Sequence, residues 1–230
     1  MYQHFIFKGI NSLDMGVVML KAPPIIKPQK RISEITIPGR NGVLHEDENS
    51  FANYTKPAEC HIMDKSRIDD VSAWLDGYGE VIFSSEPDRI YRAYVKNQIP
   101  FNNILRNIND FLVQFDCYPL KYSVNKRDEE IILSHGTTVY NKGSTSSEPV
   151  FTVYGTGDIT LVLNEESFIL RAVDEFVTVN SELQEVYKEN ESKNSSFAAG
   201  AFPVFKTGAN SIRWTGNVEK IVIQPNWRWL

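Results

Sequence analysis

Hydrophobic and polar positions alternate most regularly within residues 140–163. In Val150–Tyr154 successive side chains alternate between two faces, and in Ile159–Leu163 the apolar side chains of Ile159, Leu161 and Leu163 share one face. Gly155–Asp158 lies between these segments, and its two glycines predict a turn. The pattern therefore predicts a two-stranded meander. Because two strands are not stable alone, it requires a partner sheet.

Short apolar stretches continue at regular spacing after Glu130, separated by turn signals such as Gly208–Asn210 and Gly216-Asn217. They predict strands at residues 131–133, 167–170, 176–179, 183–187, 204–205, 211–214 and 218–223. Evenly spaced short strands are typical of a β-sandwich. We expect this sandwich to occupy residues 125–230.

The N-terminal part also predicts mainly strands, at residues 5–7, 17–20, 80–83, 90–95 and 111–118. One short helix is predicted over 66–76, with Ser66 as its cap and a single apolar face. Trp74 lies on that face, so we expect it to close the core and not to stack on a ligand. These elements predict a β-rich domain over residues 1–124.

Lys21–Arg40 is rich in proline, and prolines confine a segment to extended structure at a sheet edge. Strand character at Ile32–Ile37 therefore predicts an extended arm. Pro38–Gly42 reads as a tight turn with a strong Asn-Gly signal. An anion cradle around Arg40 is the alternative, but no helix start follows it. The polar segment Lys121–Glu130 predicts a linker between the two domains.

The chain has 230 residues, of which 42% are hydrophobic, and its net charge is −5. An acidic chain without a Lys/Arg cluster argues against nucleic-acid binding. The sequence has no signal peptide and no apolar run long enough to span a membrane, so we expect synthesis in the cytoplasm and no membrane partner. Cys60 and Cys117 are expected to be buried free thiols.

Candidate chemistry is sparse. The histidines are scattered without metal-ligand spacing, at positions 4, 45, 61 and 135. Gly155-x-Gly157 leads into a strand, which removes a dinucleotide site. Adjacent acids, as in Asp69-Asp70, Asp128–Glu130 and Glu165-Glu166, are more typical of solvated turns than of a glycosidase pair. We therefore expect no catalytic, metal or cofactor-binding residues, no cofactor and no enzymatic activity.

Three tryptophans leave a second function open. Trp214, Trp227 and Trp229 would suit a module that stacks sugar rings and binds host cell-wall glycans. The preferred interpretation is that Trp214 lies in a core strand and that the C-terminal pair packs on the sheet. A small hydrolase built on a sandwich is a further alternative, but the sequence reveals no acid/base pair for it.

Several turn and strand-end motifs follow one another in a recognisable order. They are Ile37–Gly42 (IPGRNG), Ser84–Arg89 (SSEPDR), Phe115–Pro119 (FDCYP), Tyr140–Gly143 (YNKG), Ser147–Pro149 (SEP), Tyr154–Asp158 (YGTGD), Gly208–Gly216 (GANSIRWTG) and Pro225–Arg228 (PNWR). In this combination the chain resembles the distal tail proteins of long-tailed, non-contractile phages. The resemblance spans essentially the whole chain, although no single motif is specific.

The resemblance implies a structural, non-enzymatic virion protein at the tail tip, assembled in the host cytoplasm. Its N-terminal domain is expected to form a hexameric ring and its C-terminal domain a galectin-like sandwich. The ring would join the tail tube protein to the tail-associated lysin, tail fibre and receptor-binding proteins. A proline-rich arm suits strand exchange between ring neighbours. A galectin-like fold does not by itself imply sugar binding.

Overall fold

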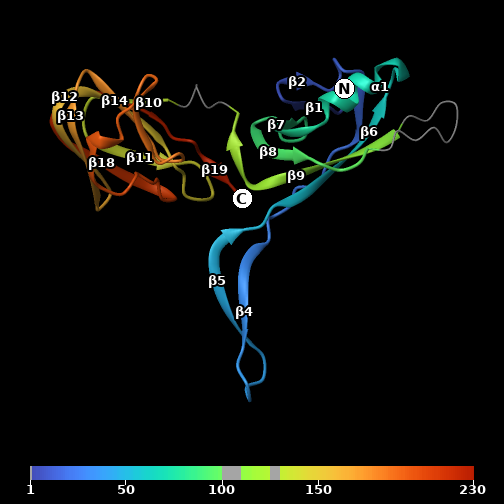
Figure 1. The fold of residues 1–230 in the computed structure, drawn as a ribbon, viewed down its shortest axis with the longest axis horizontal. Helices are drawn as coiled ribbons and strands as arrows, with labels where there is room; N and C mark the ends of the chain where they lie inside the picture. The colour runs from blue at the N-terminus through green and yellow to red at the C-terminus, as the bar shows by residue number, and fades with distance from the viewer. Residues whose placement is uncertain (1, 100–109, 125–129) are drawn as a thin grey trace. The chain divides into compact units, whose positions relative to one another are not determined.

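The computed structural model describes residues 2–99, 110–124 and 130–230. The chain divides into two compact units, here the N-terminal unit (residues 1–121 with residue 230) and the C-terminal unit (residues 122–229) (Figure 1). Each unit has its own hydrophobic core. The described residues lie mainly in strands, with one short α-helix, which confirms the predicted fold class.

The N-terminal unit is built on one curled sheet. Its strands are β1 (Phe5–Phe7), β2 (Ile10–Asn11), β3 (Val17–Lys21), β6 (Tyr54–Ile62), β7 (Gly77–Phe83), β8 (Arg89–Val95) and β9 (Asp110–Ser123). Their spatial order is β2-β1-β7-β8-β9-β6-β3. The backbone N–H of Met19 donates to the carbonyl of Gln3 over 3.0 Å. This bond brings β3 against the residues that precede β1, so the sheet curls round towards closure.

Aromatic rings fill the interior of this sheet. Phe115 on β9 contacts the rings of Phe5 and Phe83 edge-on, at centroid distances of 5.3 and 5.5 Å. Trp74 stacks on Phe5 at 5.5 Å, and its indole N–H donates to the carbonyl of Phe7 over 3.1 Å. Trp74 therefore closes the core, as predicted.

Both native cysteines lie in the same core. Cys60 and Cys117 are free and buried, as predicted. Burial disfavours the thiolate and raises the pKa of each thiol to about 12. Neither side chain is therefore poised for redox or nucleophilic chemistry.

The helix is shorter than the predicted 66–76. It consists of a 3-10 turn, η1 (Lys65–Arg67), followed by α1 (Ile68–Trp74). The predicted cap is wrong, because the side chain of Asp64 accepts from the backbone N–H of Ser66 over 2.9 Å. Asp64 precedes Ser66 and is itself a strong capping residue. Gly77, at φ +69°, then turns the chain into β7.

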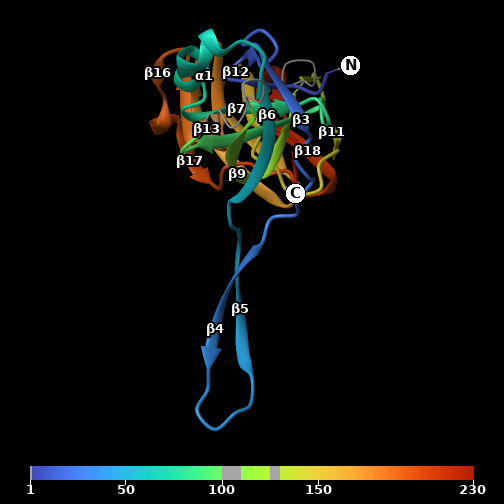
Figure 2. The same ribbon diagram turned by 90° about the vertical axis from the view of Figure 1, so that its right-hand side faces the viewer.

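The predicted arm is a β-hairpin. β4 (Lys30–Thr36) pairs with β5 (Val43–Phe51), and within the described part of the chain these strands pair only with each other. Two views show the hairpin standing apart from the sheet of its own unit (Figure 1, Figure 2). The sequence analysis did not predict β5, because its run of charged and polar residues from His45 to Ser50 lacks strand periodicity.

The C-terminal unit contains the remaining elements. They are β10 (Ile131–Leu133), β11 (Thr137–Asn141), β12 (Val150–Leu163), β13 (Glu166–Val173), β14 (Phe176–Asn180), β15 (Glu185–Lys188), β16 (Glu191–Ser192), η2 (Asn194–Ser196), β17 (Phe197–Gly200), β18 (Gly208–Gln224) and β19 (Arg228–Trp229). β12 and β18 run antiparallel along most of their length and form the centre of the unit.

These two long strands belong to both layers of a sandwich. Val150–Tyr154 of β12 pairs with β14 on one side and with the end of β18 on the other. Thr160–Leu163 pairs instead with β13 and with the beginning of β18. β10 and β11 extend opposite ends of β18. Phe151 and Phe168, from different layers, meet in one core at 6.3 Å.

The predicted turns at Gly155–Asp158 and Gly216-Asn217 are wrong. Both segments are register shifts within continuous strands, at the place where β12 and β18 pass between layers. A Cβ on Gly155 would collide with the carbonyl of Asn217, and Gly216 has φ +105°. Glycine therefore bends the strand pair here without reversing the chain. Gly208–Asn210 likewise starts β18 and makes no turn.

The predicted linker is wrong at its beginning. Lys121, Tyr122 and Ser123 are buried residues of β9. A polar sequence can be buried where its charge finds a partner, and Lys121 Nζ lies 3.5 Å from a carboxylate oxygen of Glu86. The core of the predicted linker, residues 125–129, lies outside the described residues.

Candidate assembly surface

The arm, residues 22–53, exposes aliphatic side chains on both faces of its hairpin. Ile35 and Leu44 lie opposite each other across the two strands and are 43% and 49% exposed. Directly opposed residues share a face, so these two form one apolar pair. Ile32 and Val43 belong to the alternate positions and are also exposed. A hairpin with apolar residues on both faces and two unpaired edges is a ready docking element.

Polar side-chain contacts connect the two strands of the hairpin, whose register is that of the backbone pairing of β4 with β5. Lys30 pairs with Asp47, and the Ser33 hydroxyl donates to Glu48 over 2.8 Å. The hydrogen bond from Lys30 is the largest influence that lowers the pKa of Asp47. These groups are exposed, so their contribution to stability is small. The backbone pairing determines which residues face each other and therefore the pattern that the arm presents.

The turn at the tip of the arm carries the candidate anion cradle. The backbone N–H of Arg40 donates to the carbonyl of Ile37 over 3.1 Å, which closes a turn. Gly39 and Gly42 have φ of +79° and +84°, values that favour glycine. The Arg40 side chain is exposed, and β5 begins at Val43 in place of a helix. The preferred interpretation of the motif as a hairpin turn is confirmed.

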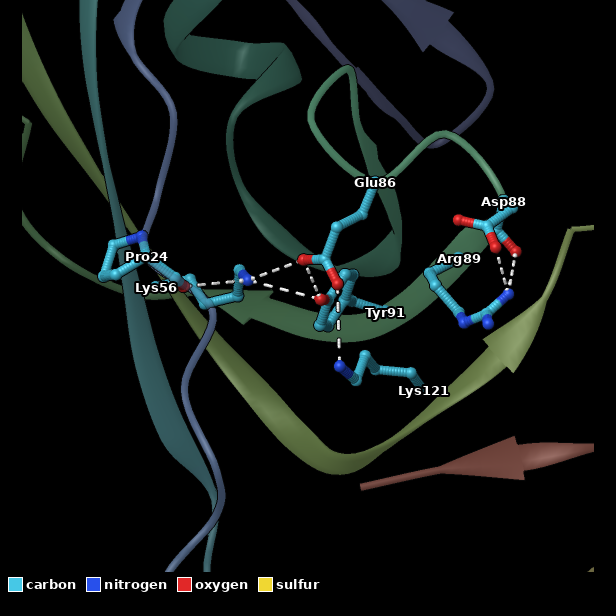
Figure 3. Close-up of polar contacts among 7 residues, drawn as sticks. All are labelled: Pro24, Lys56, Glu86, Asp88, Arg89, Tyr91 and Lys121. Atoms are coloured by element: carbon cyan, nitrogen blue, oxygen red, sulfur yellow. Dashed lines mark hydrogen bonds and ion pairs between the residues drawn. The ribbon is translucent and has the colours of Figure 1, made fainter. Parts of the chain in front are cut away.

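A buried polar cluster, the root cluster, lies where the arm joins the sheet (Figure 3). It consists of Lys56, Glu86, Tyr91, Lys121 and the carbonyl of Pro24. The Lys56 ammonium, 1% exposed, donates to Pro24 over 3.1 Å, to Glu86 over 3.3 Å and to the Tyr91 hydroxyl over 3.3 Å. Tyr91 also donates to Glu86. Each of the three ammonium protons therefore has an acceptor.

The charges of the root cluster shift one another's pKa. Burial lowers the pKa of Lys56, and the nearby Glu86 opposes that shift. Burial would raise the pKa of Glu86, but the bond from Tyr91 and the charges of Lys56 and Lys121 together lower it. Burial and the Glu86 carboxylate raise the pKa of Tyr91. Near neutral pH the cluster therefore contains an ionised carboxylate and a neutral phenol.

The described residues contain no group of three or more His, Cys, Asp or Glu side chains placed to hold a metal ion. His61 is paired with Asp110 over 2.7 Å, and Asp69-Asp70 lies in the first turn of α1. An open hollow of about 480 Å³ in the C-terminal unit is lined by apolar, polar and charged side chains, and two of the charged ones, Lys193 and Glu191, form an ion pair at 3.0 Å. Among the described residues of the whole chain, no helix is long and apolar enough to cross a membrane.

The tryptophans proposed for sugar stacking are core residues or lie against the core. Trp227 is 1% exposed, and its ring lies 5.5 Å from that of Phe205. Trp214 and Trp229 are half-buried and pack against the same core. This arrangement favours the packing interpretation. It offers no exposed face of Trp227 for a sugar ring.

The N-terminal unit matches a known family. A family model described as a phage tail protein RIFT-related domain covers residues 9–117. This range includes the whole arm and every residue of the root cluster except Lys121. Residues 9–117 are a phage tail protein domain. No curated protein matches the sequence.

The fold of the whole chain is also similar to a solved structure over its full length. That structure is the Dit protein of phage SPP1, described as a paradigm of the hub of the adsorption apparatus in phages that infect Gram-positive bacteria. The match covers 100% of both chains with a TM-score of 0.81 and 15% sequence identity. The domain match and the shared fold confirm the resemblance to siphophage distal tail proteins.

The root cluster was missed in the sequence analysis, although a signal for it exists. In β6 the inward positions are Lys56, Ala58, Cys60 and Ile62, so a lysine occupies an otherwise apolar row. A charged residue at an inward strand position requires a buried partner. The sequence does not identify that partner, because Glu86 lies in a distant turn between β7 and β8.

Proposed function

We propose that this tail protein forms a hexameric hub ring at the tail tip, which joins the tail tube to the tail-tip adhesion proteins. In the ring, the arm of one copy docks on the N-terminal unit of its neighbour. The contact is heterologous, and six such contacts close by rotation. The expected partners are the tail tube protein, the tail-associated lysin and the tail fibre or receptor-binding proteins.

The isolated arm is the observation that carries this proposal. Its aliphatic residues Ile32, Ile35, Val43 and Leu44 are exposed, and its strands pair only with each other within the described residues. Exposing such a surface is unfavourable unless a partner covers it. A partner copy that extends the hairpin by β-augmentation would satisfy both the apolar faces and an open edge. An interface of standard size would bury about 1,600 Å² in total.

The test is light scattering of the full chain over a concentration series, together with electron micrographs of tails. We expect the mass to rise towards six copies. Replacing the opposed pair, Ile35→Ser with Leu44→Ser, should raise the midpoint concentration of assembly at least about tenfold, because two aliphatic side chains lose their burial.

A matched control replaces two exposed aliphatic residues of the C-terminal unit, Ile132→Ser with Leu183→Ser. This variant should assemble like the unmodified chain. A strict monomer at every concentration, together with tails that lack a ring, would refute the proposal.

We further propose that the protein has no catalytic role and that its contribution to host attachment is structural. Glycan binding remains the alternative, and saturable binding to host cell-wall glycans that is lost in a Trp214→Ala or Trp229→Ala variant would favour it. The burial of Trp227 supports the structural role, because a buried ring cannot stack on a sugar.

A further inference from the structure

Two segments connect the hairpin of the arm to the sheet: the first leg, residues 22–29, precedes β4, and the second leg, residues 52–53, follows β5. The two legs join the sheet in different ways. The second leg continues directly into β6, whose residues pair with β9 from Tyr54 onward. The first leg leaves β3 after Lys21, the last residue paired with β6. Pro23 and Pro24 follow, and a proline has no backbone N–H to donate to a neighbouring strand. At these two positions the first leg can therefore be held only through carbonyl groups or side chains.

Lys56 provides such a hold. It lies on the second leg's continuation, two residues into β6, and its ammonium donates to the carbonyl of Pro24 on the first leg over 3.1 Å. The bond therefore crosses the root of the arm from one leg to the other (Figure 3). Further along the arm the backbone N–H of Ala52 donates to the carbonyl of Gln29 over 2.8 Å, where the paired hairpin begins.

Aromatic rings and a carboxylate around Lys56 hold its ammonium group in one position. The ammonium lies 4.4 Å from the ring centre of Tyr91 and 5.2 Å from that of Phe83. Glu86 supplies the opposite charge, and its other carboxylate oxygen lies 3.5 Å from Lys121. A buried charge with every donor satisfied has little freedom to move, because each alternative position leaves it unpaired.

We propose that Lys56 is a positioning residue that sets the direction in which the arm leaves the N-terminal unit, and that Glu86 holds Lys56 in place. Through its hydrogen bond to Pro24, the lysine side chain connects the two legs at the point where the prolines prevent strand pairing. The same carboxylate also lies 3.5 Å from Lys121 of β9, so it contacts both Lys56 at the root of the arm and a strand of the sheet. This positioning of the arm by Lys56 and Glu86 takes place within a single copy of the chain and does not depend on ring formation.

The test measures the distance between two spin labels on the full chain. One label is attached at Thr36→Cys near the tip of the arm and the other at Asp69→Cys on α1. Both sites are exposed, and the native cysteines are buried, so the label reacts at the introduced sites. Double electron–electron resonance is recorded at a dilution where light scattering reports a monomer.

Lys56→Met should broaden the distance distribution at least about twofold, since the first leg loses its hold on β6. Lys96→Met is the control, because Lys96 is 67% exposed and its ion pair with Asp116 lies outside the root cluster. That variant should leave the width unchanged. If Lys56 has a purely structural role, Lys56→Met should lower the melting temperature and leave the distribution of label distances narrow.

If Lys56→Met does not fold, Glu86→Gln decides the question, because it removes the opposite charge and keeps the shape of the side chain. It should also broaden the distribution. An unchanged distribution in a folded Lys56→Met or Glu86→Gln variant would overturn the proposal, whether or not the protein assembles into a ring.

Discussion

At the scale of single residues, the carboxylate of Glu86 links the root cluster to acid stability. The pKa of Glu86 is below its ordinary value of 4.5 in the folded protein. The groups that face it are Lys56, Tyr91 and Lys121. A depressed carboxyl pKa stabilises the folded state above the unfolded pKa, and this stabilisation is lost as the pH falls through the folded pKa.

We therefore expect the unfolding free energy of the N-terminal unit to fall as the pH decreases below 4.5, and to fall less steeply in Glu86→Gln. Calorimetry between pH 3 and pH 7 measures the effect on the transition of the N-terminal unit, which a Trp74→Ala variant identifies. Glu59→Gln, at an exposed position of β6, is the control and should keep the pH dependence of the unmodified chain. Equal pH dependence in Glu86→Gln and the unmodified chain would contradict this prediction.

The two cysteines lead to a second prediction at this scale. Burial raises the pKa of Cys60 and of Cys117 to about 12, so almost no thiolate is present at pH 8. A thiol reagent such as Ellman's reagent should therefore react with neither cysteine in the folded protein. Both should react after unfolding in urea. Rapid reaction of the native protein would show that β6 and β9 open locally.

Single residues also show how far the sequence could be interpreted. Trp74 lies on the apolar face of the predicted helix, and its burial followed from that pattern. The burial of Cys60 and Cys117 was expected from the general burial preference of cysteine. Lys56 breaks such a pattern and could have been identified as a buried charge. Its partners could not, because Pro24, Glu86 and Tyr91 come together only through the pairing of distant strands.

At the scale of elements, β12 and β18 depend on glycine at their bend. Gly155 and Gly216 are close to backbone atoms of the opposite strand, so a methyl group at either position must push the strands apart. Gly155→Ala should lower the unfolding free energy of the C-terminal unit by about 1–3 kcal/mol. Gly216→Ala adds the strain of its positive φ. Chemical denaturation of each variant measures these losses.

Thr215→Ala is the matched control for these glycines, because Thr215 is an exposed residue next to Gly216 in β18. It should change the unfolding free energy by no more than about 0.5 kcal/mol. If Gly155→Ala were as stable as the control, the close approach of β12 to β18 at this bend would be wrong.

The elements also explain why the strand predictions were partly wrong. The apolar alternation on each side of Gly155–Asp158 was recognised correctly, as was that on each side of Gly216. Glycine is compatible both with a reversal and with a bend in a continuous strand, and the choice depends on the strand that pairs across it. That pairing lies far away in the sequence. The register of long antiparallel strands therefore could not be read from local signals.

At the scale of the whole molecule, two separate cores predict two unfolding transitions. Trp74 belongs to the core of the N-terminal unit and Trp227 to that of the C-terminal unit. Trp227→Ala should destabilise the C-terminal unit by about 3–5 kcal/mol and lower one calorimetric transition. Trp74→Ala should lower the other by a similar amount. A single transition that shifts as a whole in both variants would contradict this independence.

The division into a β-rich N-terminal part and a C-terminal sandwich was predicted from the sequence because strand and turn signals recur at regular spacing. The order of the motifs then indicated the family. The structure of the arm was predicted only in part. Its first strand and its turn have strong signals, whereas β5 is polar because the described residues of the chain bury neither face of the hairpin.

The pairing of the arm also affects how quickly the N-terminal unit folds. β3 pairs with β6, and the whole arm lies between them along the chain. Closing a loop costs more entropy as the loop becomes longer, and contacts between distant residues form slowly. Once β4 has paired with β5, Lys30 and Phe51 are already adjacent, so only the two short legs remain to be closed. None of the hairpin residues belongs to the described core of the unit, yet early pairing of the hairpin lowers the entropy cost of pairing β3 with β6 and should speed that step.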